Sequence, residues 1–125
     1  METKKEGNFT YIINTEMYDK DSFINTFNEW KNRDDKSKTI GYIKGEDDSP
    51  NNITHIVENV EINDEVITGD YKILDTPRGK CIQELLKIVA NDLYFMPKMI
   101  GRYNVETGKY EINQILSFNI GYKKI

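Results

Sequence analysis

The sequence predicts an α+β fold, with a small, mostly antiparallel sheet or partly closed barrel and two helices in the order β-α-β-β-β-α-β-β. Segments rich in β-branched and aromatic residues alternate with two segments whose apolar residues recur at helical spacing. Short turn sequences separate most neighbouring strand segments, which favours hairpins. The 125 residues fit one domain, residues 1–125, in which we expect residues 1–8 to be flexible.

The first strand and the first helix are predicted from residues 9–32. Residues 9–15 (F-T-Y-I-I-N-T) are rich in aromatic and β-branched types, which is typical of a strand. Asp19 or Asp21 can then cap a helix that runs to about Asn32, because a carboxylate accepts from free N–H groups in the first turn. Its apolar face consists of three aromatic residues at i, i+4 and i+7: Phe23, Phe27 and Trp30.

Three strands are expected in the middle of the chain. Residues 39–44 predict a short strand that leads into the loop G-E-D-D-S-P at 45–50. Residues 53–62 and 65–74 each carry apolar side chains at alternate positions. Asn63-Asp64 lies between them and is typical of a tight turn, so we expect a hairpin.

The second helix is predicted to begin at the sequence D-T-P-R-G-K, residues 75–80. Thr76 can accept from free helix N–H groups, and Pro77 presets φ at the first helical position. Gly79 costs up to ~1 kcal/mol in a first turn and indicates a close backbone approach there. A buried stripe is expected from four apolar residues up to Asn91: Ile82, Leu85, Leu86 and Val89.

Two last strands, residues 93–103 and 110–122, are predicted on either side of a turn at 106–109. Pro97 cannot occupy a central strand, so the first of the two is expected to be an edge strand or to contain a bulge. An apolar edge is either covered or binds a partner. We therefore expect a protein contact surface made by five residues: Tyr94, Phe95, Met96, Met99 and Ile100.

Composition argues against several functions. The net charge of −4 and the scattered lysines disfavour nucleic-acid binding, which needs clustered cations. The apolar runs are far shorter than the ~20 residues of a membrane span, and the polar first residues lack a secretion signal. The single cysteine, Cys81, excludes an internal disulfide and fits a reducing compartment. We expect no membrane partner and no cofactor.

The acidic loop at 45–50 could bind a metal ion, and the motif at 75–80 could bind an anion, but each also has a structural interpretation. Glu46, Asp47 and Asp48 are adjacent, whereas calcium loops need acids at alternate positions and a twelfth-position glutamate. We therefore expect a solvated turn and no metal site. The T-P-R-G-K start of the second helix could attract an anion, yet it lacks a glycine-rich cradle, so we interpret it as a cap.

Candidate catalytic groups are few. His55 is the only histidine, and a base of this kind needs a nucleophile within ~3 Å. Ser49 and Ser117 offer hydroxyls, and Cys81 offers a thiol in the second turn of the predicted helix. We expect ordinary packing for Cys81 and a structural role for His55.

Several of these segments together resemble the prohead core proteases of tailed myoviruses, a family related in fold to the herpesvirus capsid-maturation protease. The family motifs include G-E-L-G-H-P, I-L-D-T-P-x-G-K and S-S-R-G-x-G. Residues 45–50 take the frame of the first, and residues 73–80 (I-L-D-T-P-R-G-K) match the second closely. Residues 93–101 stand where the third falls. The resemblance covers roughly residues 14–122 and is most specific at 73–80.

The resemblance implies a capsid-protease-like fold without the catalytic side chains. Ser49 stands where the family has its histidine, and Met96-Pro97 stand where it has its serine. A neutral hydroxyl is no base near pH 7, and a thioether has no transferable proton. We therefore expect a non-catalytic phage virion or capsid-assembly protein, located in the virion or the host cytoplasm. Its expected partners are other virion or capsid proteins, or a second copy of itself.

Two alternatives stay open at this point. One is an atypical serine protease that uses His55 with Ser49 or Ser117. The other is an intracellular phage modulator that binds a host protein or a small ligand.

Overall fold

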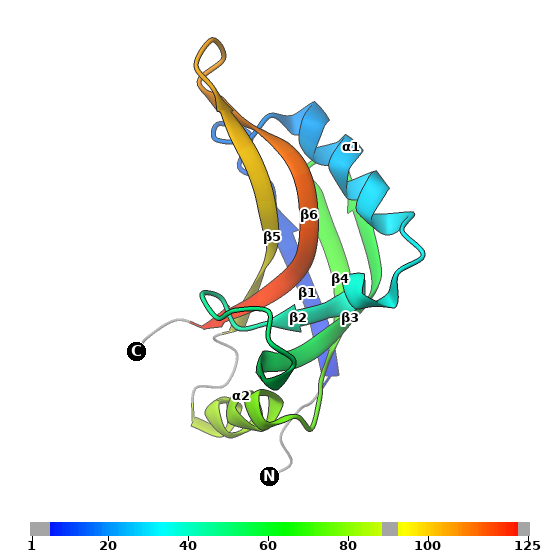
Figure 1. Ribbon diagram of the computed structural model, residues 1–125, viewed down its shortest axis with the longest axis vertical. Coiled ribbons are helices and arrows are strands. Elements are labelled where there is room, and N and C mark those ends of the chain that lie inside the picture. The colour runs from blue at the N-terminus through cyan, green and yellow to red at the C-terminus, as the bar shows by residue number, and fades with distance from the viewer. Residues whose placement is uncertain (1–5, 89–92, 123–125) are drawn as a thin grey trace.

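The computed structural model describes residues 6–88 and 93–122 (Figure 1). The described chain contains two α-helices, two short 3-10 helices and six strands. In chain order they are β1 (Glu6–Ile12), α1 (Lys20–Lys31), η1 (Lys36–Thr39), β2 (Ile40–Tyr42), η2 (Pro50–Asn52), β3 (Ile53–Asn63), β4 (Val66–Ile73), α2 (Pro77–Ile88), β5 (Leu93–Asn104) and β6 (Lys109–Tyr122).

All pairings between these strands are antiparallel, and they build two sheets. Four strands form one sheet in the order β1-β4-β3-β2, and β5 pairs with β6 in a separate hairpin. The α+β class and the order of helices and strands are as the sequence predicts. The two sheets do not close into a barrel: their strands belong to separate sheets, and an isolated bridge between Ile43 and Ile120 joins the chain after β2 to β6.

The core lies between the curved β5–β6 hairpin and the larger sheet, with α1 along one flank and α2 at the end away from the hairpin turn (Figure 1). Phe9 of β1 stacks on Phe95 of β5 with ring centroids 4.7 Å apart, and it also contacts Phe118 of β6. Trp30 of α1 meets the edge of Phe118 at 5.1 Å. Aromatic rings from four separate elements therefore fill the space between the sheets.

The helices begin where the sequence places their caps. Asp19 accepts from the Ser22 N–H at 2.9 Å, and Thr76 accepts from the Gly79 N–H at 2.9 Å. Of the stripe expected on α2, Ile82 is fully buried and Leu86 packs against the core, while Val89 and Asn91 lie outside the described residues.

Three expectations about local structure are wrong. Residues 6–8, expected to be flexible, belong to β1, where Glu6 lies opposite Lys72 of β4. The first strand, expected to end at residue 15, ends at Ile12. Cys81, expected to pack beside the stripe of α2, is exposed.

Within residues 6–88 and 93–122, no helix is long and apolar enough to cross a membrane.

Candidate functional site

The acidic loop that precedes β3 is held in place by its own carboxylates. Glu46 forms an ion pair with Arg78 of α2 at 3.0 Å, and Asp48 forms one with Lys98 of β5 at 2.7 Å. The Asn52 amide donates to Asp47 Oδ1 at 2.5 Å. The expected solvated turn is therefore a loop anchored to a helix on one side and to a strand on the other.

These contacts use the carboxylates that a metal would need. Glu46 Oε1 faces the Arg78 guanidinium, and its other oxygen, Oε2, is buried without a hydrogen-bond partner in the described chain. In the same part of the chain no group of three histidine, cysteine, aspartate or glutamate side chains could hold a metal ion.

His55 lies in the core, between β3 and β6. Its side chain is fully buried, and Nε2 is 2.8 Å from the carbonyl oxygen of Phe118, so Nε2 carries the proton and donates it. Nδ1 is buried and has no hydrogen-bond partner among the described residues. Burial lowers the pKa of His55 from 6.5 to about 4, and the bond to Phe118 only partly opposes this. The ring is neutral near pH 7.

A glycine makes room for this imidazole. Gly41 of β2 is buried opposite His55 in the strand pairing, and a Cβ there would overlap both the ring and the Phe118 carbonyl oxygen. The place of His55 is therefore fixed by β2, β3 and β6 together, which is the geometry of a structural side chain.

The two candidate hydroxyls are engaged elsewhere. Ser117 Oγ is buried and donates to Asn119 Oδ1 at 3.0 Å. Ser49 caps the short η2 helix at its N-terminus. Neither hydroxyl forms a hydrogen bond with His55 in the described chain, and the exposed thiol of Cys81 lies on α2. In the described residues, therefore, no hydrogen bond links His55 to either hydroxyl of the atypical protease.

Residues 75–80 form a cap that also ties α2 to β3. The Thr76 hydroxyl donates to the Ile53 carbonyl oxygen while it accepts from Gly79. A Cβ on Gly79 would overlap the carbonyl oxygen of Leu74, which explains the glycine in the first helical turn. Asp75 accepts from the Gln83 amide at 3.0 Å. The motif therefore positions a helix, as expected from its sequence.

The expected contact residues on β5 divide between the core and the surface. Phe95 is buried against Phe9 and cannot contact a partner in the folded protein. Tyr94, Met96 and Met99 are half-buried, and Met99 packs against the core. Only Ile100 has about half of its area exposed, at 51%. The prediction that Phe95 belongs to a contact surface is therefore wrong.

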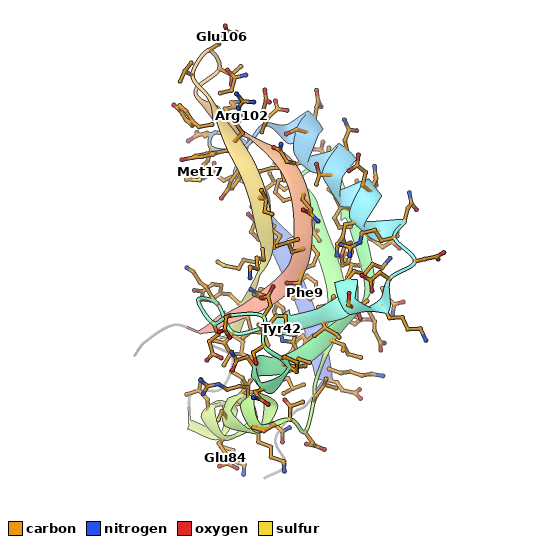
Figure 2. The ribbon with its side chains drawn as sticks, in the orientation of Figure 1. Phe9, Met17, Tyr42, Glu84, Arg102 and Glu106 are labelled. Carbon is orange, nitrogen blue, oxygen red and sulfur yellow. The ribbon has the colours of Figure 1, made fainter. Side chains whose placement is uncertain are left out.

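The exposed apolar side chains gather further along the hairpin. We define the distal surface as Met17, Tyr103, Val105 and Tyr110, which are four of the six exposed large hydrophobic residues in the described chain. Ile100 is also exposed, but strand alternation places it on the other face of β5 from Tyr103. Met17 and Arg102 project near this end of the molecule in Figure 2. The rings of Tyr103 and Tyr110 contact each other at 5.1 Å. An open cleft of about 520 Å³ adjoins them, lined by Met17, Tyr18, Pro97, Met99, Gly101, Tyr110 and Ile112.

Sequence reasoning missed the distal surface because it spans two distant segments. Met17 precedes α1, yet its carbonyl oxygen accepts from the Tyr110 N–H at 2.8 Å. The signal in the sequence was the cluster of tyrosine and valine residues around the turn at 106–109.

Comparison with known proteins identifies no relative: no family model matches the chain, and neither a curated protein nor a solved structure matches it. The resemblance to prohead core proteases stays a prediction.

Proposed function

We propose that this protein is a non-catalytic assembly component of a tailed-phage virion or capsid and acts by binding other virion or capsid proteins. The proposal combines the resemblance of residues 73–80 (I-L-D-T-P-R-G-K) to a prohead-protease motif with Ser49, Met96 and Pro97, which that resemblance aligns with the family's catalytic positions. A base and a nucleophile within bonding reach would be needed for serine-type catalysis.

The distal surface is the observation that carries the proposal. Val105 is 84% exposed and Tyr103 is 50% exposed, whereas most other large apolar residues of the described chain are inside the core. Clustered apolar and aromatic side chains on a surface are typical of protein contact sites. A cleft lined by methionine and tyrosine side chains adjoins them. Such a surface suits the burial of a partner's apolar side chain.

Incorporation into particles tests this proposal directly. Tagged wild-type protein and the variants Met17→Glu and Val105→Glu would be supplied to infected host cells, and the tag would be quantified in purified particles. We expect each variant to lower incorporation by about tenfold or more, because a charge buried at a contact centre costs over ~1.4 kcal/mol.

Ile12→Glu is the matched control. Ile12 is another exposed large hydrophobic residue and lies on β1, outside the distal surface, at 65% exposure. Its replacement should leave incorporation unchanged. Wild-type protein that stays in the host fraction and never enters particles would contradict the proposal and favour the intracellular modulator.

The atypical protease has its own test. Labelling by a serine-directed fluorophosphonate that disappears in both His55→Ala and Ser117→Ala would favour it over a binding role.

A further inference from the structure

The two edges of the β5–β6 hairpin differ sharply in how their backbone groups are satisfied. The outer edge of β6 is covered at both of its ends. The Tyr110 N–H donates to the Met17 carbonyl oxygen, and the Tyr110 carbonyl oxygen accepts from the Asp19 N–H, both at 2.8 Å. The Lys44 N–H donates to the Ile120 carbonyl oxygen at 2.8 Å. Between them, side chains of α1 reach Ile112: Thr26 donates to its carbonyl oxygen at 2.7 Å and Ser22 accepts from its N–H at 3.0 Å.

The outer edge of β5 has no comparable cover. Over 12 residues β5 pairs only with β6, and no other strand of the described chain pairs with it. Both register irregularities place the extra residue on β6, at Leu116 and Asn113, so β5 itself runs without a bulge. Bulges, prolines and lysines are the usual protection of an edge. In β5 such protection is confined to Pro97 and Lys98.

Pro97 indicates which backbone groups face the open edge. Prolines within sheets occur where the missing N–H would point away from the neighbouring strand. Because the backbone alternates along a strand, the N–H groups of Met99, Gly101 and Tyr103 share the outward direction of the Pro97 nitrogen. Residues 99–104 therefore present a regular row of donors and acceptors beside the distal surface.

The charges on β5 favour one kind of occupant. Lys98 and Arg102 are its only charged residues and lie on the same face. Lys98 is paired with Asp48, whereas Arg102 forms no ion pair within the described residues. Glu111 of β6 lies across from Arg102, and its carboxylate accepts a hydrogen bond from the Asn104 amide. A second copy of β5, paired antiparallel over residues 99–104, would bring Arg102 opposite or diagonal to another Arg102 or Lys98. Like charges directly opposite each other on paired strands are destabilising.

We propose that the outer edge of β5, at residues 99–104, binds an extended acidic segment of a partner protein by strand addition, with apolar side chains of that segment entering the adjoining cleft. The inference rests on the proposed binding function and specifies the partner's chemistry. Main-chain hydrogen bonds supply affinity in this mode, and alternate side chains supply specificity. The acidic residues of the segment would face Arg102.

Two synthetic peptides test the proposal: an eight-residue peptide that alternates valine and glutamate, and its valine–lysine counterpart, each carrying a fluorophore. Anisotropy should show that the wild-type protein prefers the acidic peptide, and Arg102→Glu should reverse the preference. We expect the dissociation constants of the two peptides to differ about fivefold in each protein, because one cross-strand ion pair contributes up to ~1 kcal/mol. Lys36→Glu, with the same charge change on the exposed η1 helix, should behave as the wild type.

Hydrogen exchange followed by NMR locates the contact. Binding should slow exchange of the Met99 and Tyr103 amides and leave the amides of β4 unchanged. Failure of the acidic peptide to bind at millimolar concentration, or protection elsewhere, would overturn the inference. Protection of the same amides by concentration-dependent dimerisation alone would assign the edge to a second copy and overturn it too. If Arg102→Glu enters particles normally while Val105→Glu does not, strand addition is wrong and the proposed function stands.

Discussion

His55 is the residue whose environment departs furthest from what its type suggests. The only histidine of the sequence invites a catalytic interpretation, yet its ring is enclosed by β2, β3 and β6 and donates to a backbone carbonyl. Desolvation disfavours the charged ring, and no carboxylate in the described chain bonds to Nδ1 to offset it. We therefore expect the titration of His55 to affect the stability of the folded protein.

The stability of the protein should fall with acidification because of His55. The folded-state pKa is lowered to about 4 from the ordinary 6.5. The unfolded chain therefore binds the proton first, so this contribution is fully present above pH 6.5 and is lost as pH falls toward 4. The slope is about 1.4 kcal/mol per pH unit within that window. Urea unfolding at pH 7, 5.5 and 4.5 measures it.

His55→Gln is the comparison for that slope, because it removes the titrating group while every carboxylate stays. The variant should be less stable at pH 7 and should lose less stability on acidification than the wild type. Parallel pH profiles for the two proteins would contradict the account of His55 as a buried neutral ring.

The candidate site could be predicted only where it depends on residue type alone. Sequence reasoning predicted from the spacing of the acids that residues 46–48 form a solvated turn and no calcium loop, and so it left these carboxylates in solvent. Their partners, Arg78 and Lys98, are separated from them by 32 and 50 positions. Contacts at such separations depend on the packing of α2 and β5 and carry no local signal. The burial of Phe95 escaped prediction for the same reason.

Helix starts and turns, in contrast, are encoded locally, and the sequence located them well. Asp19 caps α1, and Thr76 with Pro77 begins α2, since each feature involves residues within one helical turn. The β3–β4 turn is formed by Asp64 and Glu65, one residue later than the predicted Asn63-Asp64, and Asp64 adopts φ of 57°. The start of β1 was missed because its polar residues 6–8 are strand only through pairing with β4.

Gly79→Ala should destabilise α2 even though alanine is the better helix former. In an open helix interior the change would gain about 1 kcal/mol. Here the new methyl group would overlap the carbonyl oxygen of Leu74, and relieving that overlap should cost about 1–3 kcal/mol. Lys80→Ala, at the next and exposed position, is the control and should change stability by less than ~0.5 kcal/mol. An equal or greater stability for Gly79→Ala in denaturant unfolding would contradict this.

At the scale of the whole molecule, the three-residue strand β2 joins the two sheets. It pairs with β3 on one side, and the chain that follows it reaches β6 through the Ile43–Ile120 bridge. Asn119 of β6 completes the junction: its Oδ1 accepts from the Tyr42 N–H at 3.2 Å and from Ser117 at 3.0 Å. Because the same core lies under both sheets, we expect them to unfold as one cooperative unit.

Asn119→Ala tests that cooperativity. Loss of the amide oxygen leaves the Tyr42 N–H and the Ser117 hydroxyl without their acceptor, which should cost about 2–3 kcal/mol. Trp30, which lies between α1 and Phe118, reports on the junction by fluorescence, while far-ultraviolet circular dichroism reports on both sheets. The two transitions should coincide in the wild type and shift together in the variant. Gln114→Ala, exposed on the same strand, should leave both in place. A fluorescence transition that separates from the dichroism transition in Asn119→Ala would mean that the hairpin detaches before the larger sheet unfolds.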